Sequence, residues 1–156
     1  MKINIKDYPK RGHRQVNINI EKFDTWSLDR TLAMIIYPSL MQLKATKQGI
    51  PTEFATVGGE DYDAQQSFDF YTDSVDDSFI LATAQWAEVM DKMTWSFQQL
   101  CFDDFDDKYH HGELEFNEGK WVRNGAWYDH VGHMMHLDRI QEGLDLFGKY
   151  YQHLWD

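Results

Sequence analysis

The chain has 156 residues, a formal net charge of −11 and 15% aromatic residues. This length fits one domain, residues 1–156, with a core of its own. The negative charge disfavours direct binding to nucleic acid or to an anionic membrane surface, because phosphates carry the same sign. The single cysteine, Cys101, excludes an intramolecular disulfide framework and a cysteine-based zinc cluster. Basic proteins and metal ions remain candidate partners.

No apolar run reaches the roughly 18 residues that a membrane-spanning helix needs. The N-terminus alternates polar and apolar residues instead of presenting the apolar stretch of a signal peptide. These features predict a chain that stays in a reducing cytoplasm.

Two alternating stretches begin the chain. Isoleucine and valine side chains fall on one face of residues 2–8 and on one face of residues 15–22, which is the pattern of half-buried strands. The basic residues 9–14 between them include proline and glycine and predict a turn. We therefore expect a β-hairpin over residues 2–22. An isolated hairpin is marginally stable, so we expect it to lie on the helices or to pair with another strand.

Three longer stretches have helical periodicity, with apolar residues at spacings of three, four and seven. They predict helices over about residues 26–47, 78–101 and 127–154. Pro38 lies inside the first and predicts a kink or a break, because it lacks the amide that the preceding turn needs. Residues 49–76 are acidic, lack sustained periodicity and predict a long loop.

A short hairpin is also predicted over residues 114–122, turning at residues 117–119. The fold class that we expect is α+β, mainly α, with three long helices around an aromatic core and the N-terminal β-hairpin laid against them. One continuous apolar stripe on the last helix predicts that this helix is central to the core. Gly143 and Gly148 on it predict a close approach by a neighbouring element.

One face of the second helix carries an unusual combination. Glu88, Asp91 and Trp95 are spaced at i, i+3 and i+7, away from the helix's apolar stripe. If this face is open to solvent, Trp95 is a binding anchor with acidic neighbours, suited to an arginine-bearing partner. If the hairpin or the acidic loop covers it, Trp95 belongs to the core. Packing of the helix on two sides favours the second interpretation.

Histidines and aspartates allow a metal site as an alternative. His130 and His133 are spaced to share an ion on a helix, yet they fall on the apolar face, where buried hydrogen-bonded histidines explain them equally well. His136 lies at the border of that face, where a structural hydrogen bond is favoured over a general base. Asp29 falls in the first helical turn, where an acidic residue balances the helix dipole. An Asp29, Asp91, His133 and His136 cluster between helices would instead hold a divalent ion.

No motif of catalysis is present. The sequence has no nucleophile elbow and no glycine-rich phosphate loop, since the paired glycines Gly58 and Gly59 lack a following lysine. A protein without catalytic activity and without a cofactor is therefore favoured over an enzyme.

Three blocks are the most distinctive parts of the sequence: residues 22–29 with DTWSLD, residues 87–97 with DKMTWSF, and residues 139–151, RIQEGLDLFGKYY. Together they resemble a group of small acidic proteins encoded by tailed bacteriophages. The resemblance implies a phage origin and the cytoplasm of an infected bacterial host, without implying a mechanism. The blocks contain or adjoin the polar residues singled out as binding candidates, which are Asp29, Glu88, Asp91, Trp95, His136 and Arg139.

The sequence thus predicts a phage-encoded acidic accessory protein without catalytic activity, which binds a host or phage protein through those residues. A basic partner is one expectation, and homo-oligomerisation is another. The alternatives are a metal-dependent hydrolase or nucleotide-binding protein, and a minor component of the virion.

Overall fold

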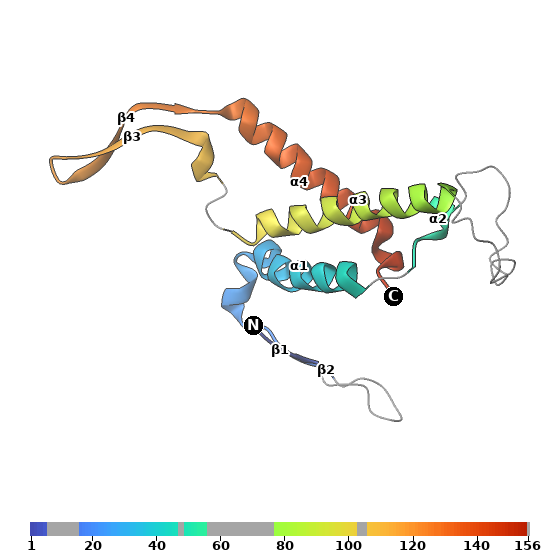
Figure 1. Cartoon of the computed structure of the whole chain (residues 1–156). Helices are drawn as coiled ribbons and strands as arrows, with labels where there is room; N and C mark the ends of the chain where they lie inside the picture. Colours follow the sequence, from blue (N-terminus) through green and yellow to red (C-terminus); the bar gives the residue numbers. More distant parts are fainter. Residues whose placement is uncertain (6–15, 47–48, 56–76, 103–105, 156) are drawn as a thin grey trace, which may run out of the picture.

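The computed structural model describes residues 1–5, 16–46, 49–55, 77–102 and 106–155 (Figure 1). Most of the predicted acidic loop of residues 49–76 lies outside these ranges. Its first part contains the short helix α2, Thr52–Ala55. No helix in the described ranges combines the length and the apolar character that crossing a bilayer requires.

The three predicted long helices are confirmed, and the fold class is α+β, mainly α (Figure 1). They are α1, Leu28–Thr46, α3, Asp77–Leu100, and α4, His130–Tyr150. Both α1 and α4 pack on α3, which is therefore the central helix of the three. The apolar stripe of the last helix had predicted that α4, and not α3, is central to the core.

α1 continues through Pro38 without the predicted break. The carbonyl that loses its hydrogen bond to this proline belongs to Met34. Met34 and Pro38 are both exposed, so water can satisfy that carbonyl. The helix is therefore not forced to end where the proline occurs.

α4 begins three residues later than predicted and is followed by the 3₁₀ turn Tyr151–His153. Its first predicted residues belong instead to a strand that continues to Tyr128. Asp129 then caps the helix, because its side chain accepts a hydrogen bond from the Gly132 amide at 2.9 Å.

The core is aromatic at one end and rich in methionine at its centre. Met90 and Met93 of α3 are fully buried between α1 and α4. Trp86 lies with its ring centroid 5.6 Å from Phe54 of α2 and 5.2 Å from Tyr150 of α4. The aromatic cluster therefore joins α2, α3 and the end of α4, as expected for an aromatic core.

Gly143 is the point of closest approach between α3 and α4. A Cβ atom at this position would lie 2.0 Å from Ser96 Oγ and 2.6 Å from the Lys92 carbonyl oxygen. The predicted role of Gly143 is thus confirmed. The same prediction for Gly148 is wrong, because a Cβ there would meet no described atom within 4 Å.

The N-terminal hairpin is confirmed, with β1, Lys2–Ile5, paired to β2, Val16–Asn19. It is connected to α1 through η1, Lys22–Thr25, and the N-terminal amine pairs with Asp24 at 2.6 Å. The prediction that it lies on the helices is wrong. All four residues of β2 are exposed. The strand pair points away from α1 (Figure 1).

A second, longer hairpin separates α3 from α4. β3, His110–Asn117, pairs with β4, Lys120–Tyr128, after the short 3₁₀ turn η3, Asp107–Tyr109. The predicted turn is confirmed, and its central residues Glu118 and Gly119 have φ of 48° and 80°, as a two-residue type I′ turn requires. This hairpin, here called the arm, projects from the helices (Figure 1).

Candidate functional site

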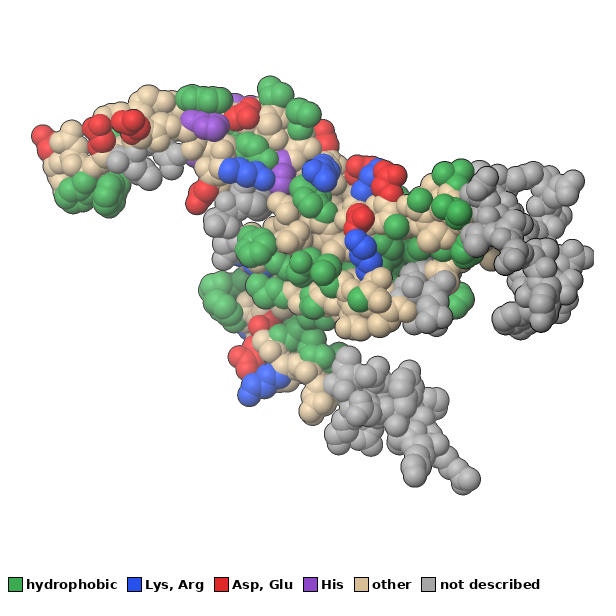
Figure 2. Space-filling model, viewed as in Figure 1, with side chains coloured by type: hydrophobic (Ala, Val, Ile, Leu, Met, Phe, Trp, Pro, Cys, Tyr) green, Lys and Arg blue, Asp and Glu red, His purple; other side chains and the backbone are tan. Residues whose placement is uncertain are grey.

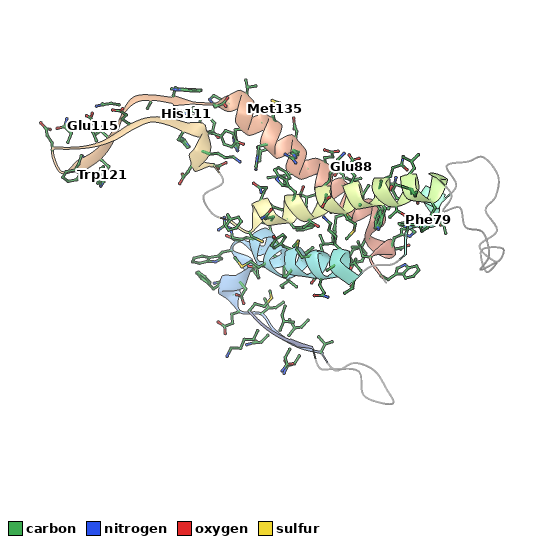
Figure 3. The ribbon with its side chains drawn as sticks, in the orientation of Figure 1. Phe79, Glu88, His111, Glu115, Trp121 and Met135 are labelled. Carbon is green, nitrogen blue, oxygen red and sulfur yellow. The ribbon has the colours of Figure 1, made fainter. Side chains whose placement is uncertain are left out.

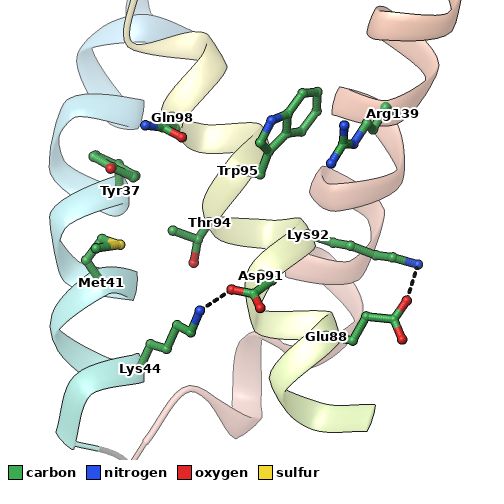
Figure 4. Close-up of a pocket in the computed structure, with 10 residues that line it drawn as sticks. All are labelled: Tyr37, Met41, Lys44, Glu88, Asp91, Lys92, Thr94, Trp95, Gln98 and Arg139. Carbon is green, nitrogen blue, oxygen red and sulfur yellow. Dashed lines mark hydrogen bonds and ion pairs between the residues drawn. The ribbon is translucent and has the colours of Figure 1, made fainter. Parts of the chain in front are cut away.

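A groove of about 610 Å³ lies between α1, α3 and α4 (Figure 4). Ten residues line it: Tyr37, Met41, Lys44, Glu88, Asp91, Lys92, Thr94, Trp95, Gln98 and Arg139. The structure thus brings together four of the six residues predicted for binding, namely Glu88, Asp91, Trp95 and Arg139.

Helical periodicity explains why these side chains meet. On α3, Glu88, Asp91 and Trp95 follow one face of the helix, away from the buried stripe of Trp86 and Met93. On α1, the spacing of Tyr37, Met41 and Lys44 places them on the side that faces α3. Arg139 reaches the groove from α4. The groove therefore forms where the edges of three helix faces meet.

Ion pairs hold the charged side chains of the groove, and those of Lys44 with Asp91 and of Lys92 with Glu88 are drawn in Figure 4. Lys44 of α1 pairs with Asp91 of α3. Lys92 lies 2.8 Å from Glu142 and 3.1 Å from Glu88, and hydrogen bonds to Glu142 and then to Glu88 raise the pKa of its ammonium group. The acidic neighbours of Trp95 thus already have cationic partners within the chain.

Trp95 forms one wall of the groove. The Arg139 guanidinium lies over its indole ring, 3.9 Å from the ring centroid, and the His136 ring contacts it edge-on at 5.2 Å. Trp95 is half-buried. It is therefore partly covered, by α4 and not by the N-terminal hairpin. Among the described residues, no carboxylate lies within ion-pair distance of the Arg139 guanidinium.

His136 packs against the Trp95 ring. Its ring is buried, and the Lys108 ammonium donates a hydrogen bond to His136 Nδ1 at 3.1 Å. The predicted structural hydrogen bond is therefore confirmed. Burial lowers the pKa of His136, and the nearby charges of Lys108, His133 and Arg139 lower it further, with Asp106 opposing them. The side chain is consequently neutral at pH 7.

Acidification is expected to destabilise the fold through His136. Because its pKa is below 6.5 only in the folded state, the unfolded chain binds more protons as the pH falls. Stability is then present above the unfolded pKa and is lost as the pH falls towards the folded pKa. We expect the melting temperature of the wild type to fall more than that of His136→Gln between about pH 7.5 and about pH 5.5. Equal losses in the two proteins would show that another group governs the change.

The other two predicted residues, Asp29 and His133, lie elsewhere. Asp29 is exposed in the first turn of α1, outside the groove. His133 Nε2 lies 2.8 Å from Asp106, and its Nδ1 is hydrogen-bonded to the Tyr128 hydroxyl at the base of the arm. The structure thus separates the residues proposed for a metal cluster.

No group of three or more metal-binding side chains is assembled within the described ranges of the chain. The metal-dependent alternative stays a prediction that no described cluster supports.

Sequence reasoning missed the contribution of α1 to the groove. None of its residues Tyr37, Met41 and Lys44 was singled out from the sequence as a binding candidate. Their spacing of four and three residues was a signal that they share a face. Only the packing of α1 on α3 shows which surface that face meets.

The fold and the groove define a small, mainly helical protein with a mixed-charge, aromatic-lined surface site. Comparisons of the chain with protein-family models, with curated proteins and with solved structures find no match. The function is therefore argued from the groove itself.

Proposed function

We propose that the protein is a non-catalytic accessory protein of a tailed bacteriophage, which binds a protein partner in the groove between α1, α3 and α4. The phage origin and the cytoplasm of the infected cell follow from the resemblance of the three sequence blocks. The binding function follows from the groove.

The observation that carries the proposal is the arrangement of Arg139 on Trp95. A guanidinium group offers a planar fork of donors that matches a carboxylate. Here it is held against the indole ring at 3.9 Å, and no described carboxylate occupies its donors. Arg and Trp are also the residue types that contribute most to binding in protein interfaces. A side chain already held in place loses less entropy when a partner binds.

The geometry favours an acidic side chain on the partner. Three cationic and two anionic residues line the groove, in a chain whose net charge is −11. Glu88 and Asp91 are paired with Lys92 and Lys44, so we place the partner's charged contact at Arg139. This proposal takes the place of the basic partner expected from the sequence. Met41 of α1, on the opposite side of the groove from Arg139, offers an apolar contact to the partner.

The test begins with affinity capture from infected cells, followed by the dissociation constant of the purified pair. We expect Arg139→Ala to weaken binding at least about tenfold, as for loss of an interface hot spot. Arg139→Lys keeps the charge but loses the fork, and we expect it to restore only part of the affinity. Lys149→Ala removes a cation from the same helix outside the groove and is the matched control.

Unchanged affinity in Arg139→Ala would place the binding site outside this groove. Recovery of the protein with purified virions would instead identify it as a virion component, the third interpretation of the sequence.

A further inference from the structure

The junction between the arm and α4 is rich in histidine. Five of the seven histidines of the chain fall at the start of β3 or in the first two turns of α4: His110, His111, His130, His133 and His136. Figure 2 shows histidine side chains where the arm meets the helices, and Figure 3 shows His111 and Met135 on the two sides of this junction. The charge of histidine ordinarily changes between about pH 5 and about pH 8, so this junction is placed to respond to acid.

His136 is the buried member of this group, and it joins the arm to the helices. Its Nδ1 atom lies 3.1 Å from the ammonium nitrogen of Lys108 in η3, the turn that leads into β3. Its ring centroid lies 5.9 Å from that of Tyr109, which is also buried, and 5.2 Å from that of Trp95. His136 therefore contacts both the base of the arm and the wall of the groove.

The contact with Lys108 requires a neutral imidazole. An ammonium group can only donate hydrogen bonds, so His136 Nδ1 must accept and carry no proton of its own. Protonation of the ring turns Nδ1 into a donor and sets two positive groups 3.1 Å apart. The hydrogen bond is then lost, and Coulomb repulsion drives the ammonium group of Lys108 away from the ring.

The surroundings of His136 oppose its protonation. The charged groups that face it are Lys108 and Asp106 from the base of the arm and His133 and Arg139 from α4 itself. Burial lowers the pKa of His136 most, the charges of Lys108, His133 and Arg139 lower it further, and Asp106 opposes them. Asp106 is already paired with His133 at 2.8 Å. The neighbouring phenol of Tyr109 and indole of Trp95 carry no charge in this pH range. His136 thus binds a proton more weakly while the junction is closed.

One backbone hydrogen bond reports on the closed junction. The amide of Asp129, the residue that caps α4, donates to the Tyr109 carbonyl at 2.9 Å, which extends the pairing of β3 with β4 to the start of α4. Because Tyr109 follows Lys108 directly, loss of the contact between Lys108 and His136 loosens the segment that accepts this bond.

We propose that the junction is a pH-sensitive joint, in which protonation of His136 releases Lys108 and loosens the base of the arm from α4. Since the closed joint binds the proton more weakly, acid favours the open one. If His136 titrates near its ordinary value of 6.5 once the joint is open, the opening equilibrium constant rises at most about 30-fold between about pH 7.5 and about pH 5.0. This inference goes beyond the partner binding proposed for the groove and does not depend on it.

The test is amide hydrogen exchange of the free full-length protein, followed by NMR from about pH 7.5 to about pH 5.0 and corrected for intrinsic exchange rates. We expect the protection factor of the Asp129 amide to fall by about 5- to 30-fold as the pH falls. At each pH it should stay below that of the amide of Met93 in the buried core, because local opening precedes global unfolding.

Three variants assign the effect. His136→Gln keeps an acceptor for Lys108 but does not titrate, so its Asp129 protection should change by less than about threefold. Lys108→Met removes the donor, and protection should already be low at pH about 7.5. Lys120→Met makes the same exchange near the turn of the arm and should behave as the wild type.

A protection factor that stays constant in the wild type, or that falls equally in His136→Gln, would overturn the proposal. So would equal protection of the Asp129 and Met93 amides, since only global unfolding would then open the junction. Wild-type protection in Lys108→Met would show that this contact does not hold the arm. Lys108 is exposed, so this variant keeps the test decisive even if His136→Gln does not fold. No partner is present, so the result is independent of binding in the groove.

Discussion

Replacing Trp86 by alanine is expected to lower the free energy of unfolding by about 3–5 kcal/mol, the usual cost of removing a buried large aromatic side chain. Trp86 is only 3% exposed, and its ring contacts Phe54 and Tyr150. The substitution therefore removes the ring contacts by which α3 touches Phe54 of α2 and Tyr150 of α4. Urea unfolding monitored by circular dichroism measures the change.

Trp95→Ala is the matched control for this substitution. It removes the same side chain from the same helix, but Trp95 is half-buried at the groove and contacts Arg139 and His136. We expect a clearly smaller loss than for Trp86→Ala. Equal losses at the two positions would contradict the assignment of Trp86 to the core.

Replacing Gly143 by alanine is expected to cost about 1–3 kcal/mol, the range for overpacking a closely packed site. The added methyl group would overlap Ser96 Oγ and the Lys92 carbonyl oxygen, at 2.0 Å and 2.6 Å. Ser96 is completely buried, so it has no open space into which to turn. α3 and α4 must then move apart, and the free energy of unfolding falls.

Gly148→Ala on the same helix provides the control. No described atom lies within 4 Å of the position of its Cβ. Alanine favours helix over glycine, so the expected change ranges from none to a gain of about 1 kcal/mol. If both substitutions destabilised the protein equally, helix propensity and not the contact with α3 would account for the loss at Gly143.

Helical periodicity predicted the three long helices. Each of them buries an apolar face against a neighbouring helix, and a buried face requires apolar residues at helical spacing. The start of the last helix was misplaced because Trp127 and Tyr128 continue its apolar pattern. They are nevertheless strand residues, and Asp129 caps the helix that follows. Because the strand leads almost directly into the helix, the sequence pattern did not show where the strand ends and the helix begins.

The alternating pattern predicted the N-terminal hairpin, and the turn residues 117–119 predicted the second, but neither signal predicted what surrounds these hairpins. A period of two shows that one face of a strand is apolar, and it does not show what covers that face. The N-terminal hairpin was expected on the helices because an isolated hairpin is marginal. In the structure the four residues of β2 are exposed instead.

The groove was only partly predictable. The spacing of Glu88, Asp91 and Trp95 on one helix could be read from the sequence. That lysines neutralise both carboxylates, and that Arg139 covers Trp95, depends on which helices are neighbours. The sequence therefore identified groove residues on α3 and α4 but not those on α1, and the packing of the helices changed the charge expected of the partner.

Photo-cross-linking from within the groove tests the binding function most directly. A photoreactive phenylalanine analogue at Met41 lines the groove, and the same analogue at Met34 is an exposed control on the same helix. During phage infection, we expect Met41 to yield a cross-linked partner protein that Met34 does not yield. Adding Arg139→Ala should abolish this product. Equal products at both positions, or a product that Arg139→Ala leaves unchanged, would contradict binding in the groove.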